Sequence, residues 1–330
     1  MMKKNVLCGR NKEIMVTKQM AIADLNLVFG KDEDPMIKWV DDIVLPALQS
    51  GISREAQGNT KYFFWNVELR EVRENEYAIC GLLIKHTVLD VNDQFHEGEG
   101  LEHLDLHIPS SPYSAFMIYL KNHKMALVKN GKGSPNLRNF SAAFRNIIVS
   151  YTREQNEIRR KQEKPLLPFG ILNIAGIKTD DSIRNALQGV EKVKEFKVRF
   201  FPLNSQWDDG SLVGAIDERW RKVLKSNTSN LVFNTPQSLE GVITVAEQME
   251  GLADVELTVE YPNDGLLEGK NTTKIKNGKL AEKTNIDLSG DLDESFEEID
   301  EYCKRKKAMT KVTNNLIIDY EAFLEKRRKS

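Results

Sequence analysis

The chain has few cysteines and no long hydrophobic run. Among its 330 residues, Cys8, Cys80 and Cys303 are too few and too far apart for a disulfide framework or a zinc site. No apolar run approaches the roughly 18 residues of a membrane-spanning helix. The apolar stretch after the first residues is also too short for a signal peptide. These absences predict a soluble, cytoplasmic protein and argue against the membrane, secreted and fibrous classes.

Local catalytic motifs are missing as well. The sequence has no nucleophile elbow, no glycine-rich dinucleotide-binding motif and no paired cysteines. We therefore predict no catalytic residue and no cofactor. An active site assembled from dispersed residues would leave no local signature, so the question of an enzyme stays open at this stage, with a non-enzymatic function favoured.

Four of the five histidines lie within residues 86–107. His103 and His107, four residues apart, would share one face of a helix, as two metal ligands can. Two glycines and Pro109 disfavour a helix there, and in a strand the two histidines would stand roughly 13 Å apart. We expect an acidic solvated loop between two strands, and no bound metal.

One set of residues has the composition of a metal-dependent nuclease. Such sites use an Asp followed by Glu-x-Lys on adjoining strands, where the acids hold the ion and the lysine activates water. Asp254 followed by Glu268-Gly269-Lys270 provides these residue types. Because Glu268 lies between glycines in a predicted loop, this is the weakest of the functional hypotheses.

The composition indicates a globular protein with a substantial core. Apolar residues make up 40% and charged residues 29%, and 47 basic against 49 acidic residues give a net charge of −2. The length suggests two domains. Two prolines and a glycine within residues 164–170 mark a boundary, which predicts domains at residues 1–164 and 165–330.

Hydrophobic periodicity predicts an α+β fold. The first domain would contain a helical opening that starts at Asp34-Pro35 and is disturbed at Pro46, an antiparallel sheet and a covering basic helix. The second would be a mixed α/β domain with C-terminal helices. The predicted strands are residues 62–70, 77–89, 115–120, 125–129, 171–177, 193–201 and 255–261; the predicted helices are 137–164, 180–187, 211–224, 238–249 and 293–307, with a last amphipathic segment to residue 330. Asn277-Gly278 predicts a hairpin turn.

The charge distribution is strongly uneven. Residues 121–164 contain eleven basic and three acidic residues, a net charge of +8, whereas residues 86–107 contain six acids and no Lys or Arg. Basic residues on a turn and along a helix suit contact with phosphates. We therefore predict sequence-independent binding of nucleic acid, most simply duplex DNA. The predicted contact residues are Lys121, Lys124, Lys129, Lys132, Arg138, Arg145, Arg153, Arg159, Arg160 and Lys161.

Two other interpretations of this charge stay open. The basic face can simply be solvated and balance the acidic segment within the fold. It can also belong to a protein-interaction subunit that engages a partner protein without binding nucleic acid.

The chain has a predicted strand at residues 114–120 with a returning strand at 125–128, then Gly133-Ser134-Pro135 before a helix, and later residues 230–236, the hairpin at 276–279 and a terminal charged helix. This order of elements resembles the Rex-type phage-exclusion protein and related bacterial phage-defence proteins. The resemblance implies a homodimeric, cytoplasmic, DNA-associated protein of bacterial anti-phage defence without a known catalytic centre. No functional residue is carried over from it.

Apolar residues near the C-terminus also suggest assembly. Leu316, Ile317, Ile318, Tyr320, Phe323 and Leu324 need a surface that covers them, and a second copy is one candidate. The sequence therefore predicts a homodimer held in part by the residues after Thr310.

Overall fold

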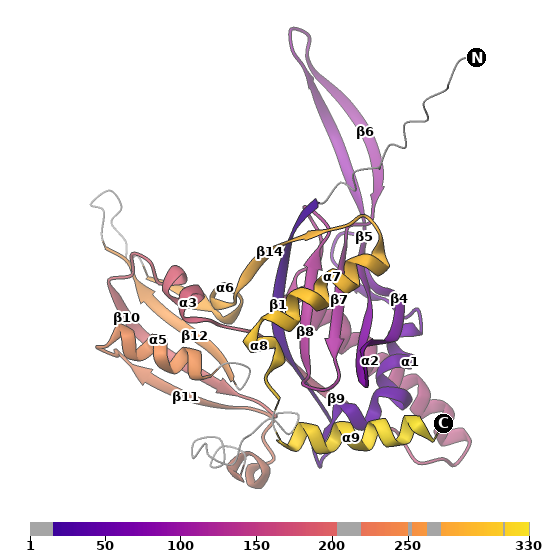
Figure 1. Cartoon of the computed structure of the whole chain (residues 1–330). Helices are drawn as coiled ribbons and strands as arrows, with labels where there is room; N and C mark the ends of the chain where they lie inside the picture. The colour runs from indigo at the N-terminus through magenta and orange to yellow at the C-terminus, as the bar shows by residue number, and fades with distance from the viewer. Residues whose placement is uncertain (1–15, 203–218, 250–252, 263–271, 313, 330) are drawn as a thin grey trace, which may run out of the picture.

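The computed structural model describes residues 16–202, 219–249, 253–262, 272–312 and 314–329 (Figure 1). Within these residues the chain forms two antiparallel sheets with helices packed on them, which confirms the predicted α+β class. None of the described helices is both long enough and apolar enough to cross a lipid bilayer.

The larger sheet contains ten strands. Seven follow one another in the order β14 (Lys283–Leu288), β1 (Val16–Phe29), β8 (Lys124–Lys129), β7 (Tyr113–Tyr119), β5 (Glu76–His96), β4 (Thr60–Arg73) and β3 (Arg54–Ala56). Three more are added at the side: β2 (Asp34–Pro35) and β9 (Gly170–Gly176) pair with β1, and β6 (Gly100–Ser110) pairs with β5.

The first strand was not predicted from the sequence. β1 spans 14 residues and pairs with four other strands, and it precedes the helical opening that the sequence predicted from Asp34-Pro35 onward. Every residue from 22 to 29 is buried. A strand that is covered on both faces has no alternation of polar and apolar residues, so the period-two signal is absent.

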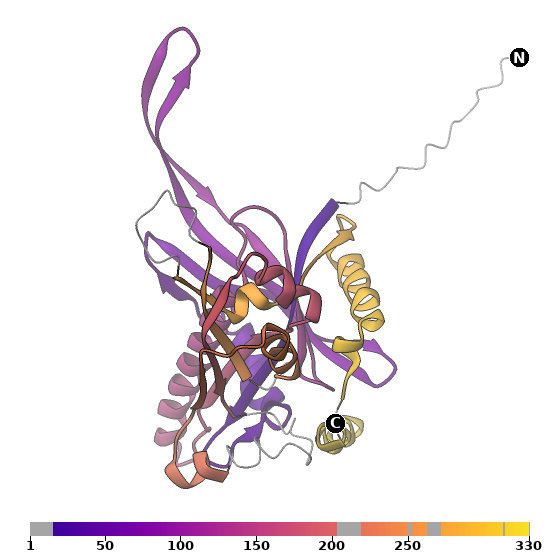
Figure 2. The same cartoon turned by 90° about the vertical axis from the view of Figure 1, so that its left-hand side faces the viewer.

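Helices cover both faces of the larger sheet. On one face, α1 (Leu45–Gln49), α2 (Leu137–Lys161) and α9 (Asn314–Arg328) enclose a core that contains Phe64, Phe116 and Phe140. On the other face, α7 (Leu292–Arg305) and α8 (Lys307–Thr310) pack on Met20 and Ile22. Figure 2 shows α2 and α7 on opposite sides of the sheet.

The predicted opening helix is present but irregular. A 3-10 turn (Met36–Trp39) and a π turn (Val40–Val44) precede α1, in whose first turn Pro46 lies. Proline has no backbone N–H, but the N–H groups in the first turn of an α-helix have no intrahelical partner in any case. Pro46 therefore does not prevent α1 from starting at this point.

The smaller sheet has four strands in the order β11 (Ser229–Asn234), β10 (Lys192–Phe200), β12 (Ala253–Glu260) and β13 (Thr272–Lys276). Helices α3 (Asp180–Ala186) and α5 (Leu239–Gln248) pack on one of its faces and enclose a separate core. In Figure 1 this sheet lies beside the larger one.

The predicted boundary at residues 164–165 does not separate the two sheets. After that point β9 pairs with β1, and β14 later returns to the same strand. The smaller sheet is therefore an insertion between two segments of the larger one.

The predicted hairpin at Asn277-Gly278 is also wrong. Residues 277–280 form a single helical turn, α6, because the strands on its two sides belong to different sheets: β13 pairs with β12, and β14 pairs with β1.

Four of the six apolar residues predicted to need a cover near the C-terminus are buried by the chain itself. Leu316, Tyr320, Phe323 and Leu324 of α9 are at most 5% exposed, and three of them belong to the core on the α2 side of the sheet. A single chain therefore covers these four, whereas Ile317 and Ile318 of the same helix are 42% and 69% exposed, and the predicted homodimer stays a prediction.

A buried histidine in the β7–β8 turn gives a testable pH dependence. His123 is 1% exposed with an unpartnered Nδ1, and burial lowers its pKa to about 3. In the unfolded chain it takes up a proton below about pH 6.5, so stability falls as the pH drops from that value toward 3, by at most about 1.4 kcal/mol per pH unit. Because its φ is +54°, Asn is the suitable replacement.

We expect His123→Asn to reduce the slope of unfolding free energy against pH between pH 6.5 and 4.5, measured by urea denaturation. The exposed His107→Asn serves as the control and should keep the parent's slope. Equal slopes for His123→Asn and the parent would show that this histidine does not govern the pH dependence.

Candidate nucleic-acid interface

A cleft of about 830 Å³ lies between α2 and the smaller sheet. α2 and β9 form one wall, and the strands of the smaller sheet form the other. The polar residues of the cleft are Arg138, Ser141 and Arg145 from α2, Lys197 and Arg199 from β10, Asn230 from β11, Asp254 and Glu256 from β12, Lys276 from β13 and Lys279 from α6.

Strand alternation produces the charged wall on the smaller sheet. On β10, Val198 belongs to the core under α3 and α5, so its neighbours Lys197 and Arg199 point to the opposite face. On β12, Val255 is buried in the same way, and Asp254 and Glu256 therefore face the cleft. The face that α3 and α5 leave uncovered is thus a charged surface.

The two acids of the cleft lie opposite cations. The strand register pairs Arg199 with Asp254 and Lys197 with Glu256. Glu256 also accepts from Lys274 at 3.1 Å and lies 3.5 Å from Lys276. Desolvation opposes ionisation of Glu256, but the lysines outweigh it and hold its pKa below the usual value.

The pKa of Asp254 is shifted in the opposite direction to that of Glu256. Burial raises its pKa above the usual value, although Lys178 and Arg199 act against that shift. Its partial burial thus outweighs the two nearby cations.

The α2 wall has an aligned row of arginines. Arg138, Arg145, Arg153 and Arg160 are exposed, and at 3.6 residues per turn they fall within about 80° of the helix circumference. The row is roughly 33 Å long, close to one turn of duplex DNA. Among the described residues none of these four side chains has a carboxylate partner within 4 Å.

The cleft therefore has an excess of positive charge. Among the described residues six cations and two acids line it, and the strand register places each acid opposite a cation of the sheet. Arg145 is also held in place, since its Nη2 donates to the backbone oxygen of Leu172 at 2.8 Å. A cationic cleft continued by a row of arginines suits a linear polyanion.

The other predicted contact residues do not join this surface equally. Lys124 is buried and forms an ion pair with Asp24, so it cannot reach a phosphate. Arg159 donates to the backbone oxygen of Pro165 at 3.0 Å. Lys129 is half-buried at the end of β8, whereas Lys132 and Lys161 are exposed. The ten predicted contact residues therefore have different surroundings, and their contact with nucleic acid stays a prediction.

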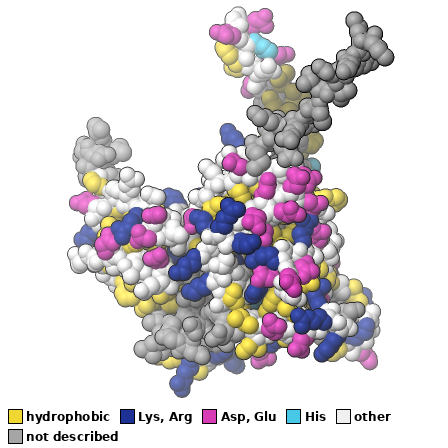
Figure 3. All heavy atoms as spheres, viewed as in Figure 1, with side chains coloured by type: hydrophobic (Ala, Val, Ile, Leu, Met, Phe, Trp, Pro, Cys, Tyr) yellow, Lys and Arg dark blue, Asp and Glu magenta, His cyan; other side chains and the backbone are white. Residues whose placement is uncertain are grey.

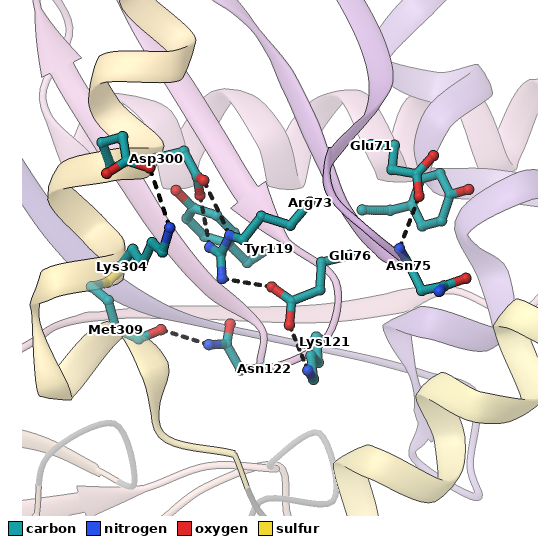
Figure 4. A network of polar contacts seen from close by, with 12 residues as sticks. Glu71, Arg73, Asn75, Glu76, Tyr119, Lys121, Asn122, Asp300, Lys304 and Met309 are labelled. Carbon is teal, nitrogen blue, oxygen red and sulfur yellow. Dashed lines mark hydrogen bonds and ion pairs between the residues drawn. The ribbon is translucent and has the colours of Figure 1, made fainter.

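Lys121 belongs to a structural network on the α7 side of the sheet (Figure 4). Its Nζ lies 2.5 Å from Glu76, which also binds Arg73 at 2.6 Å. Arg73 in turn makes two hydrogen bonds to Asp300 of α7, at 2.7 and 3.1 Å. These ion pairs and hydrogen bonds connect the β4–β5 turn to α7, and Lys121 is one of their members.

The nuclease hypothesis gains no support from the described residues. No group of three His, Cys, Asp or Glu side chains within them is close enough together to hold a metal ion. Glu268 and Lys270, which that hypothesis required, lie outside the described residues. Burial raises the pKa of Cys80 and of Cys303 to about 12, so neither thiol is a nucleophile near neutral pH.

The cations of the smaller sheet were missed by the sequence analysis. Lys197, Arg199, Lys276 and Lys279 lie far along the chain from α2, and only the insertion of the smaller sheet brings them opposite it. The alternation on β10 was visible, but nothing in it indicated which surface that face would meet. No protein-family model and no curated protein matches the chain.

Proposed function

We propose that the protein binds nucleic acid, with duplex DNA as the preferred ligand, through phosphate contacts in the cleft between α2 and the smaller sheet. The observation that carries this proposal is the aligned row Arg138, Arg145, Arg153 and Arg160, which has no carboxylate partner among the described residues and runs into the cationic cleft. No catalytic step is part of the proposal.

Binding of this kind is independent of sequence. Arginines on a helix face and lysines on a sheet contact the backbone of the duplex, and counterion release supplies the affinity. The setting in bacterial anti-phage defence rests only on the resemblance to Rex-type phage-exclusion proteins.

The test is a salt series with the unmodified chain. We expect similar affinities for unrelated duplex sequences, and a slope of log affinity against log salt of about −0.9 for each phosphate contacted. Single-stranded DNA and RNA should be measured beside the duplex, with and without magnesium. Absence of binding at low salt would refute the proposal and favour the protein-interaction interpretation, whereas strand cleavage that requires magnesium would favour the nuclease.

A further inference from the structure

A long β-hairpin arm projects from the larger sheet. Among the described strands, residues 87–110, the end of β5 and all of β6, pair only with each other, from Thr87 opposite Ser110 to His96 opposite Gly100. Figures 1 and 2 both show this arm extending away from the rest of the molecule. The predicted acidic loop at residues 96–107 is therefore the outer half of a paired hairpin.

The arm has two different faces. Because cross-strand pairs share a face, Leu89–Ile108, Val91–Leu106 and Phe95–Leu101 form three apolar rows on one side. Asp93 and His103 form the one charged row between them, joined by a hydrogen bond of 3.1 Å. The other side contains Val88–Pro109, Asp90–His107 and Gln94–Glu102, and the register shifts by one residue between Val91 and Asp93.

Within the described part of the chain, no element covers the apolar face. Phe95 is 69% and Leu101 is 76% exposed, and Leu89, Leu106 and Ile108 are each about half exposed. In Figure 3 hydrophobic and acidic side chains share the arm. A two-stranded hairpin is marginally stable by itself, and apolar rows of this size mark a contact surface.

We propose that a second copy of this chain covers the apolar face, with the two arms packed face to face around a two-fold axis. Stacked sheets lie about 10 Å apart, so the side chains of the two apolar faces can interdigitate as in a small β-sandwich. The acidic side of each arm then points outward to solvent. In a two-fold contact the same surface of both copies meets, so each apolar row of one arm packs on apolar rows of the other.

Charge favours a second arm over a membrane or a nucleic acid as the occupant. The arm has six acids and no Lys or Arg, which disfavours anionic lipid and phosphate. Asp93 and His103 lie on different strands, so an arm stacked with β5 over β6 of its partner places Asp93 of each copy near His103 of the other. In this arrangement the carboxylate of Asp93 in each copy lies beside the imidazole of His103 in the other.

The area agrees with a modest but specific dimer. The exposed parts of the five large apolar side chains amount to roughly 500 Å² per copy, so two arms would bury roughly 1,000 Å², the lower end for biological interfaces. A dimer that dissociates at micromolar concentrations is the expected result.

The first test compares variants of the two faces of the arm. In light scattering of the parent chain at protein concentrations raised to about 100 µM, we expect dimers to form. The pair Leu101→Lys and Leu106→Lys should convert it to monomers, while Gln94→Lys and Glu102→Lys on the opposite face should leave dimers. Because the arm lies outside all three cores, thermal unfolding should be unchanged in both pairs.

The second test uses cross-linking in a Cys8→Ser background, where the buried Cys80 and Cys303 stay unreactive. Leu101→Cys should give cross-linked dimers with a short bis-maleimide, and the adjacent Glu102→Cys, on the other face, should not. A monomeric parent at about 100 µM, or equal cross-linking of the two cysteines, overturns the proposal. Neither result depends on nucleic acid, so the two proposals fail independently.

Discussion

Replacing all four arginines of the α2 row by alanine is expected to weaken duplex DNA binding by a factor on the order of 10³ near 0.1 M salt. Each phosphate contact adds about 0.9 to the slope of log affinity against log salt, so each loss costs roughly eightfold at that concentration. The variant Arg138→Ala, Arg145→Ala, Arg153→Ala and Arg160→Ala should therefore also show a flatter slope on every sequence. Fluorescence anisotropy across a salt series measures both quantities.

A control with the same loss of charge separates local contact from net charge. Lys304→Ala, Arg305→Ala, Lys326→Ala and Arg328→Ala remove four exposed cations from α7 and α9, outside the cleft. On the face with α7, acidic and basic side chains are interspersed (Figure 3). We expect this variant to keep most of the parent's affinity. Equal losses in the two variants would mean that DNA responds to overall charge and that the α2 row is not the site.

Breaking the buried ion pair of β1 and β8 is expected to have the largest effect on stability. Lys124 and Asp24 form an ion pair with both side chains at most 9% exposed, and Oδ2 of Asp24 has no hydrogen-bond partner. Lys124→Ala leaves the Asp24 carboxylate buried without its cation, a loss of about 3–5 kcal/mol in unfolding free energy. Urea denaturation at pH 7 measures this.

Two further variants test whether the loss of unfolding free energy in Lys124→Ala comes from the broken ion pair. Lys121→Ala removes a neighbouring lysine whose side chain is 40% exposed, and we expect a cost of no more than about 1 kcal/mol. The double variant Asp24→Leu with Lys124→Met replaces the pair by apolar groups and should recover most of the stability. It should also bind DNA like the parent, because Lys124 lies inside the fold. A Lys124→Ala variant as stable as Lys121→Ala would contradict this account.

Local signals determined most of the secondary structure. The aromatic and branched residues of β4, the alternation in β10 and the capped, amphipathic α2 could each be predicted, because nearest-neighbour preferences and one-sided burial leave a periodic pattern. The acidic segment around residues 86–107 and the basic segment that follows it were also visible as charge. Such features depend only on residues close together in the chain.

Only the tertiary structure decided which of these segments meet. β1 is covered on both faces and so has no alternation, and the turn at Asn277-Gly278 is helical because its flanking strands pair with different sheets. Lys124 forms an ion pair with Asp24, 100 residues away in sequence, while Lys197 and Arg199 line the cleft opposite α2. The sequence by itself determined where the charge and the apolar periodicity lie. Long-range strand pairing decided which charges are buried, which are compensated and which remain exposed, because these depend on contacts between residues far apart in the chain.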